Sequence, residues 1–266
     1  RSSDSGVEST SSYDARDMGI KAGMPIYLAK KKAEKYDLDV YFLPVDKQYY
    51  GQVSDDIKEN ILMDYDVKIE QASIDEFYME FDSSEYDLNS IKTIVDEVKN
   101  KIKENYNITC SVGIAPNKLI AKIASDRDKP DGLTIVNEED IEEFMLSLDL
   151  SDIYGIGPKT IDRLNELGIE SVEDLSNTSL HILEEKFGKN TGRKLYNKAN
   201  GIDDSPVVDR NPQQISRLIT LKRDTENFNE IKPHLDELGE KIIKKVNELK
   251  VKFSRVTVIV IDNNIK

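Results

Sequence analysis

The chain has 266 residues, enough for more than one domain, and its 38% hydrophobic and 33% charged residues are typical of a soluble globular protein. It shows no apolar run as long as a membrane span and no signal peptide, so we expect no membrane partner. A net charge of −14 argues against nucleic-acid binding through a basic surface, although residues 217–266 hold 11 basic and 8 acidic side chains.

The single cysteine, Cys110, cannot form an internal disulfide. Because disulfides persist mainly in oxidising compartments, the cysteine content predicts a reducing compartment and a cytoplasmic protein. Residues 108–114 around it are predicted to form a strand. A thiol in such a strand is expected to act as a small buried side chain and not as a nucleophile.

Residues 1–43 are predicted to form a loop-rich, mostly helical subdomain. Pro25 favours the first turn of a helix that ends near Tyr36, and residues 39–43 are predicted to form a short strand. Tyr13 and Arg16 are three residues apart, so a helical turn places their phenol and guanidinium on one face. That pair suits a polyphosphate, and a tyrosine packed on an arginine stem accounts for it equally well.

Two adjacent acidic residues, Asp75 and Glu76, lie in the turn between two predicted antiparallel strands. Apolar residues alternate with others over residues 67–72 and 77–81, which is typical of a half-buried hairpin. Adjacent carboxylates repel each other, and burial adds a desolvation cost, so we expect a cation to offset their charge. Oxygen ligands suit Mg²⁺ or Mn²⁺. A solvated surface turn is the simpler interpretation.

The rest of residues 44–137 alternates predicted helices and strands, which indicates an α+β layer. Apolar residues recur at helical spacing over residues 53–65 and 91–102. Asn117 is a predicted N-cap of a third helix, which ends before the turn at Lys129-Pro130-Asp131-Gly132 and the strand at 133–136. These elements predict an antiparallel sheet with helices on one face.

An all-helical region begins near residue 137, and residues 150–164 have a helix-hairpin-helix pattern. Apolar residues flank the turn Gly155-Ile156-Gly157, and a new helix opens at Pro158-Lys159. Glycines let the backbone pass close to a ligand, and a helix N-terminus directs N–H groups outward, so the turn is predicted to hold a DNA phosphate. A tight turn between two packed helices is the alternative.

Residues 217–266 are predicted to form a basic β-α-β module that follows an extended linker at 211–216. The predicted strands are residues 217–221 and 255–261, and apolar residues recur at helical spacing from Leu235 to Leu249. Lys222 and Arg223, at the end of the first strand, are candidates for contacts with a DNA backbone.

The motifs of the chain, in their order, resemble those of Y-family translesion DNA polymerases, specifically the DNA polymerase IV class and its archaeal relatives. The matching motifs are Tyr13-x-x-Arg16, Gly23-Met24-Pro25, Ser73-Ile74-Asp75-Glu76, Ser111-Val112-Gly113-Ile114-Ala115-x-Asn117-Lys118, Lys129-Pro130-x-Gly132 and Gly155-Ile156-Gly157-Pro158. Each motif is weak alone, but their shared order makes chance similarity improbable.

The resemblance implies a right-hand fold with fingers at 1–43, palm at 44–137, thumb at 138–210, a linker at 211–216 and an incomplete little finger at 217–266. It implies template-directed DNA synthesis past damaged bases, in which two Mg²⁺ ions, or Mn²⁺, clamp the attacking 3′ oxygen and the leaving pyrophosphate. Asp75 and Glu76 match the catalytic metal ligands. The implied nucleotide-binding residues are Thr10, Tyr13, Arg16, Ser73 and Lys129. The implied DNA-binding residues are Gly155, Ile156, Gly157, Lys159, Lys222 and Arg223.

The resemblance also implies partners and missing parts. The expected partners of this monomer are primer–template DNA, deoxynucleoside triphosphates and a sliding clamp that binds a C-terminal tail. The family's third metal carboxylate and its ribose-excluding aromatic residue are expected before Arg1, and the rest of the little finger after Lys266. We therefore expect residues 1–266 alone to be inactive or nearly so.

Two other functions fit parts of the sequence. A non-catalytic helix-hairpin-helix DNA-binding repair module would keep the phosphate site without the chemistry, and Asp75→Ala would then change nothing. Another palm-like nucleotidyl enzyme, such as a nucleotide cyclase, would use the acidic turn without primer–template DNA. Fold alone does not decide between such functions.

Overall fold

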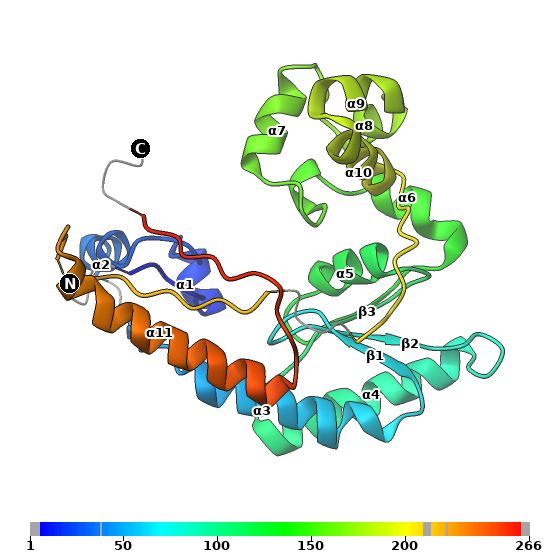
Figure 1. The fold of residues 1–266 in the computed structure, drawn as a ribbon. Helices are drawn as coiled ribbons and strands as arrows, with labels where there is room; N and C mark the ends of the chain where they lie inside the picture. The colour runs from blue at the N-terminus through cyan, green and yellow to red at the C-terminus, as the bar shows by residue number, and fades with distance from the viewer. Residues whose placement is uncertain (1–5, 38, 210–213, 222, 262–266) are drawn as a thin grey trace. The chain divides into compact units, whose positions relative to one another are not determined.

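The computed structural model describes residues 6–37, 39–209, 214–221 and 223–261. The described chain divides into two compact units, one of residues 47–210 and one that combines residues from 1–46 and 211–266. Figure 1 labels their helices and strands. No helix in the described ranges combines the length and the apolar character that crossing a membrane requires.

The first half of the 47–210 unit packs two helices against a β-hairpin (Figure 1). Its elements are α3 (Lys47–Asn60), the 3₁₀ turn η1 (Leu62–Asp64), β1 (Lys68–Gln71), β2 (Phe77–Glu80) and α4 (Leu88–Tyr106). The strands are antiparallel, as predicted, with Ile69 opposite Met79. Both of these side chains pack against a buried cluster from α3, η1 and α4 that includes Ile61 and Val98.

A β-α-β unit follows, made of β3 (Val112–Ile114), α5 (Lys118–Arg127) and β4 (Leu133–Ile135). Asn117 caps α5 as predicted, since its side-chain oxygen accepts a hydrogen bond from the Ile120 amide at 3.0 Å. Gly113 lies directly beneath α5, and a Cβ at this position would be 2.1 Å from the carbonyl oxygen of Ala121. The close approach of strand and helix therefore requires glycine there.

The sheet topology differs from the prediction. In the described residues β1–β2 and β3–β4 are separate two-stranded sheets, and the second pair is parallel. The α+β class is right, but the expectation of one antiparallel sheet is wrong, because α5 is a crossover that returns β4 in the direction of β3. β3 is also shorter than predicted, since it begins at Val112 instead of residue 108.

The second half of the 47–210 unit is helical, as predicted. Its elements are η2 (Glu138–Asp140), α6 (Ile141–Leu146), η3 (Leu150–Asp152), α7 (Pro158–Asn165), α8 (Val172–Asn177), α9 (Leu180–Phe187) and α10 (Lys189–Ala199). The fully buried leucines Leu164, Leu175 and Leu183 lie in its core. The same core includes Ile120 and Ile123 of α5, so α5 packs with both halves of the unit.

The other unit contains α1 (Tyr13–Asp17), α2 (Ile26–Lys35) and α11 (Phe228–Leu249), with a small core that includes Ile20 and Ala29. The helix predicted over 235–249 is confirmed. The strands predicted at 39–43, 217–221 and 255–261 are wrong, because no strand is formed by the described residues of these segments. Leu218 and Val260 are 79% and 74% exposed. A strand needs a ladder partner and a buried face, so these apolar segments stay irregular here.

Candidate functional site

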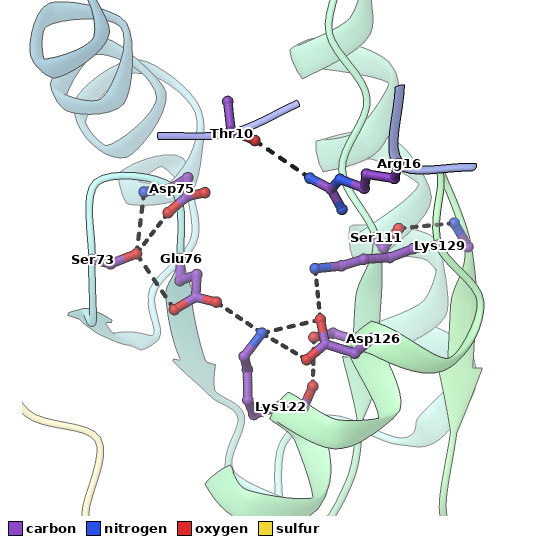
Figure 2. Close-up of polar contacts among 11 residues, drawn as sticks. Thr10, Arg16, Ser73, Asp75, Glu76, Ser111, Lys122, Asp126 and Lys129 are labelled. Atoms are coloured by element: carbon purple, nitrogen blue, oxygen red, sulfur yellow. Dashed lines mark hydrogen bonds and ion pairs between the residues drawn. The ribbon is translucent and has the colours of Figure 1, made fainter. Parts of the chain in front are cut away.

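The turn between β1 and β2 places the two predicted acids around one hydroxyl group. Ser73 Oγ lies 2.7 Å from Asp75 Oδ1 and 3.4 Å from Glu76 Oε2 (Figure 2). The amides of Ala72 and Ser73 donate to the Glu76 carbonyl oxygen and close the turn. A hydroxyl has a single proton to donate, so Ser73 orients the carboxylates without cancelling their mutual repulsion.

These residues fit a divalent cation. Two carboxylates on a partly exposed turn converge on one point, and hard oxygen ligands are those that such cations prefer. Across the part of the chain that the structure describes, no group of three or more His, Cys, Asp or Glu could hold a metal alone. Two carboxylates do not fill the coordination shell of such an ion, so further ligands would be needed at this turn.

Helix α5 supplies a lysine that faces the acidic turn. Lys122 Nζ lies 2.8 Å from Glu76 Oε1 and 2.9 Å from Asp126 Oδ2, and Lys129 Nζ lies 2.6 Å from Asp126 Oδ1 (Figure 2). Burial alone would lower the pKa of Lys122, but its bonds to Glu76 and Asp126 outweigh burial and raise that pKa. Burial would likewise raise the pKa of Asp126, but Lys129 and Lys122 lower it. Lys122 and Asp126 are thus both charged at neutral pH.

Sequence reasoning did not identify Lys122 or Asp126. Their i,i+4 spacing is that of an ordinary pair on a solvated helix face. The Lys122 side chain is nevertheless only 12% exposed, which is rare for lysine. The missed signal is the position of Lys122 one residue before the buried Ile123 on a short helix that packs on both sides.

A buried ion pair between Glu70 of β1 and Lys118 of α5 supports the hairpin. Glu70 is 6% exposed, and its Oε2 lies 2.6 Å from Lys118 Nζ and accepts a hydrogen bond from the Val208 amide at 3.1 Å. Lys118 also lies 4.8 Å from the ring centroid of Tyr78, and burial raises the pKa of Tyr78 to about 12. These contacts hold the segment that leaves the helical half against the hairpin.

In the other unit, three of the five predicted nucleotide-binding residues lie in or just before α1: Thr10, Tyr13 and Arg16. The Arg16 guanidinium carbon lies 5.0 Å from the Tyr13 ring centroid, and Arg16 donates to Thr10 Oγ1 at 3.3 Å and to the Ser11 carbonyl at 3.0 Å. All three predicted residues are exposed. This geometry is compatible both with a polyphosphate site and with simple packing of tyrosine on arginine.

The predicted helix-hairpin-helix is formed. Gly155 has a φ of +81°, which favours glycine, and Gly157 is the N-cap of α7. A Cβ at Gly157 would meet no described atom within 4 Å, so this backbone is open to a ligand. Ile153 and Ile156 anchor the turn in the core, where they are 1% and 4% exposed.

Two basic residues lie next to this turn. Lys159 is exposed in the first turn of α7, as expected of a group that contacts a phosphate. Lys198 of α10, which the sequence did not single out, donates to the Tyr154 carbonyl and lies 5.5 Å from the Tyr154 ring centroid. Burial lowers the pKa of Lys198. Its link to the turn depends on helix packing, which no local pattern shows.

The predicted strand-end pair is only partly described. Arg223 is 79% exposed and pairs with Glu230 at 3.1 Å. Lys222 lies outside the described residues.

Comparisons with known proteins agree on one family. Residues 1–126 match the impB/mucB/samB family, and residues 151–203 match the DNA polymerase-iota thumb domain. DNA polymerase IV 1 of Methanosarcina mazei is 40% identical over 275 residues, covering 100% of this chain and 73% of the relative. A solved Y-family DNA polymerase chimera of Dbh and Dpo4 is 34% identical with a TM-score of 0.83, covering 92% of this chain and 70% of the chimera. An insertion ternary complex of Dbh DNA polymerase is also 34% identical, with a TM-score of 0.73 and 92% and 70% covered.

These matches decide between the functions left open by the sequence. They include the acidic hairpin as well as the helix-hairpin-helix, so they favour a polymerase over a non-catalytic repair module. The right-hand polymerase fold with a helix-hairpin-helix thumb is confirmed. The chain belongs to the DNA polymerase IV family of the Y-family polymerases, DNA-directed DNA polymerases that act in translesion synthesis.

Proposed function

We propose that the β1–β2 turn is the catalytic metal site of this polymerase and that Asp75 and Glu76 hold two Mg²⁺ ions, or Mn²⁺ in their place. The observation that supports this most directly is the convergence of both carboxylates on Ser73 Oγ, at 2.7 and 3.4 Å. Bound there, the ions would supply charge neutralisation for the triphosphate and favour ionisation of the primer 3′ hydroxyl.

The chain's own residues orient the reactants. Ser73 fixes the Asp75 carboxylate by its 2.7 Å hydrogen bond. Lys129 neutralises the charge that grows on pyrophosphate while the 3′ oxygen bonds to the α-phosphorus and the bond to pyrophosphate breaks. The exposed cluster of Thr10, Tyr13 and Arg16 binds the triphosphate.

The proposed domains are those expected from the sequence: fingers at 1–43, palm at 44–137, thumb at 138–210, a linker at 211–216 and a little finger at 217–266. The thumb turn at Gly155, Ile156 and Gly157 binds the DNA backbone through the amides at the N-terminus of α7, with help from Lys159, and Lys222 and Arg223 contact DNA from the little finger. Primer–template DNA and deoxynucleoside triphosphates are the substrates of this monomeric, cytoplasmic enzyme, and a sliding clamp is a further candidate partner.

Asp75→Ala in the full-length protein tests the metal site. We expect primer extension to fall by about 10³-fold or more, because the loss of a metal ligand removes several kcal/mol of transition-state stabilisation. Primer–template affinity should stay within about twofold, since phosphate contacts of the thumb determine it. Glu80→Ala is the matched control, because Glu80 lies on the same hairpin but pairs with the exposed Lys68.

Retention of extension by Asp75→Ala would contradict the proposal. Equal loss of extension and of DNA binding would mean that the turn supports the fold and not the chemistry. Conversion of a nucleoside triphosphate without primer–template DNA would favour the cyclase-like alternative.

A further inference from the structure

Four side chains of alternating charge connect the acidic turn to the lysine that follows α5. The chain of contacts runs Glu76, Lys122, Asp126, Lys129, with Nζ–O distances of 2.8, 2.9 and 2.6 Å (Figure 2). The outer members are the residues that we assign to metal and to pyrophosphate. The inner members, Lys122 and Asp126, have no assigned role.

Lys122 is the most enclosed member of this chain. Its side chain is 12% exposed, against 39% for Glu76, 46% for Asp126 and 40% for Lys129. A lysine so enclosed between two carboxylates cannot easily exchange its partners for water. Its ammonium therefore has a fixed position next to the acidic turn.

The two oxygens of Glu76 have different neighbours. Oε1 accepts from Lys122 and Oε2 faces Ser73 Oγ at 3.4 Å. Fixing a glutamate side chain in one rotamer costs conformational entropy. A partner that fixes Glu76 before the reaction removes this entropy cost from the reaction step. Lys122 thus holds one oxygen of Glu76 toward α5 and leaves the other next to Ser73 Oγ.

The same ammonium governs Asp126. Asp126 contacts Lys122 and Lys129 together, so its negative charge is shared between them. Without Lys122, Asp126 would pair with Lys129 alone and hold it more tightly. Lys129 would then be less available for a triphosphate.

We propose that Lys122 is a positioning residue for nucleotidyl transfer, which fixes the Glu76 carboxylate and limits the hold of Asp126 on Lys129. The proposal depends on the metal and nucleotide roles proposed above for Glu76 and Lys129. Lys122 both orders a metal ligand and places a positive charge beside it, so its loss should strengthen metal binding while it slows the reaction.

The test measures Mn²⁺ binding by electron paramagnetic resonance, without DNA or nucleotide, and steady-state primer extension in saturating Mg²⁺. The variants of the full-length protein are Lys122→Met, Lys122→Gln and Lys122→Arg, with Lys68→Met as the control because Lys68 makes an exposed ion pair with Glu80 on the same hairpin. Thermal unfolding establishes which variants are folded. If Lys122→Met does not fold, Lys122→Gln takes its place.

The neutral variants should bind Mn²⁺ about three- to tenfold more tightly, because a positive charge beside the site is gone. Their kcat should nevertheless fall by about 10- to 100-fold and their KM for the nucleotide should rise, as is typical when a group that orients a metal ligand is lost. Lys122→Arg should restore both properties in large part, and Lys68→Met should leave both unchanged.

Either of two results overturns the proposal: Mn²⁺ binding by folded neutral variants that is unchanged or weaker, or a kcat equal to that of the original protein. A purely structural role would weaken binding and activity together. Asp75→Ala separates this failure from failure of the metal site. If Asp75→Ala abolishes Mn²⁺ binding and extension while Lys122→Met behaves as the original, only the role of Lys122 is wrong; if Asp75→Ala changes neither, the metal site is wrong.

Discussion

Two turns of the 47–210 unit have proposed ligands, and they present different groups to them: the β1–β2 turn is proposed to bind metal ions and the helix-hairpin-helix turn a DNA phosphate. The β1–β2 turn presents the charged side chains Asp75 and Glu76, and α5 and Ser73 hold or orient them. The helix-hairpin-helix turn presents glycine backbone at Gly155 and Gly157, anchored by buried isoleucines. In the first turn the essential property is charge, and in the second it is backbone shape.

This difference explains how an acidic chain can bind DNA. The net charge of −14 would oppose binding that depended on a basic surface. Backbone amides at a helix N-terminus attract a phosphate without any net charge on the protein. In the proposed function, the acidic β1–β2 turn therefore holds a cation while the thumb turn binds DNA through its backbone.

Removal of a charge beneath the acidic hairpin should have the largest effect on stability. Lys118→Met leaves Glu70, whose side chain is 8% exposed, as a buried carboxylate without its ammonium partner. We expect the free energy of unfolding to fall by about 3–5 kcal/mol, measured by urea denaturation. Lys68→Met, in a pair 68% and 42% exposed, should cost about 1 kcal/mol or less. Similar losses in both variants would show that the buried pair does not stabilise the fold.

Several features of the 47–210 unit could be predicted from the sequence alone. Period-two alternation placed Ile69 and the apolar residues of β2 correctly, and the Asn117 cap and the glycine turn were predicted from local chemistry. These features depend on neighbours within a few residues along the chain.

Other features depend on distant segments and could not be predicted. The alternating pattern of the hairpin does not show that Lys118 and the segment at Val208 bury Glu70. Lys122 contacts the Glu76 carboxylate of a turn 46 residues earlier, and its proposed role depends on that contact. The apolar and β-branched residues at 217–221 and 255–261 favour strands, but composition does not reveal whether a ladder partner is present.

Substitution of the two thumb glycines should separate strain from ligand access. Gly155→Ala combines a φ of +81° with a Cβ only 2.5 Å from Lys198 Nζ, so we expect a loss of about 1–2 kcal/mol in the free energy of unfolding. Gly157→Ala, with a φ of −95° and open space, should change stability by less than about 0.5 kcal/mol. It should nevertheless weaken primer–template binding in a fluorescence anisotropy titration, because the added methyl keeps a phosphate away. Unchanged DNA affinity in folded Gly157→Ala would place the DNA elsewhere.

The smallest predicted effect is on the salt dependence of DNA binding, which distinguishes a lysine contact from a backbone-amide contact in the thumb turn. Lys159 is exposed in the first turn of α7, so Lys159→Gln should remove one charged phosphate contact. The slope of log K against log salt concentration should then become shallower by about 0.9 for duplex DNA. Gly157→Ala should lower the affinity at every salt concentration with the slope unchanged, because an amide that binds phosphate releases no counterion. If Lys159→Gln leaves the slope unchanged as well, the turn binds DNA by backbone alone, and the contrast with the palm is sharper than proposed.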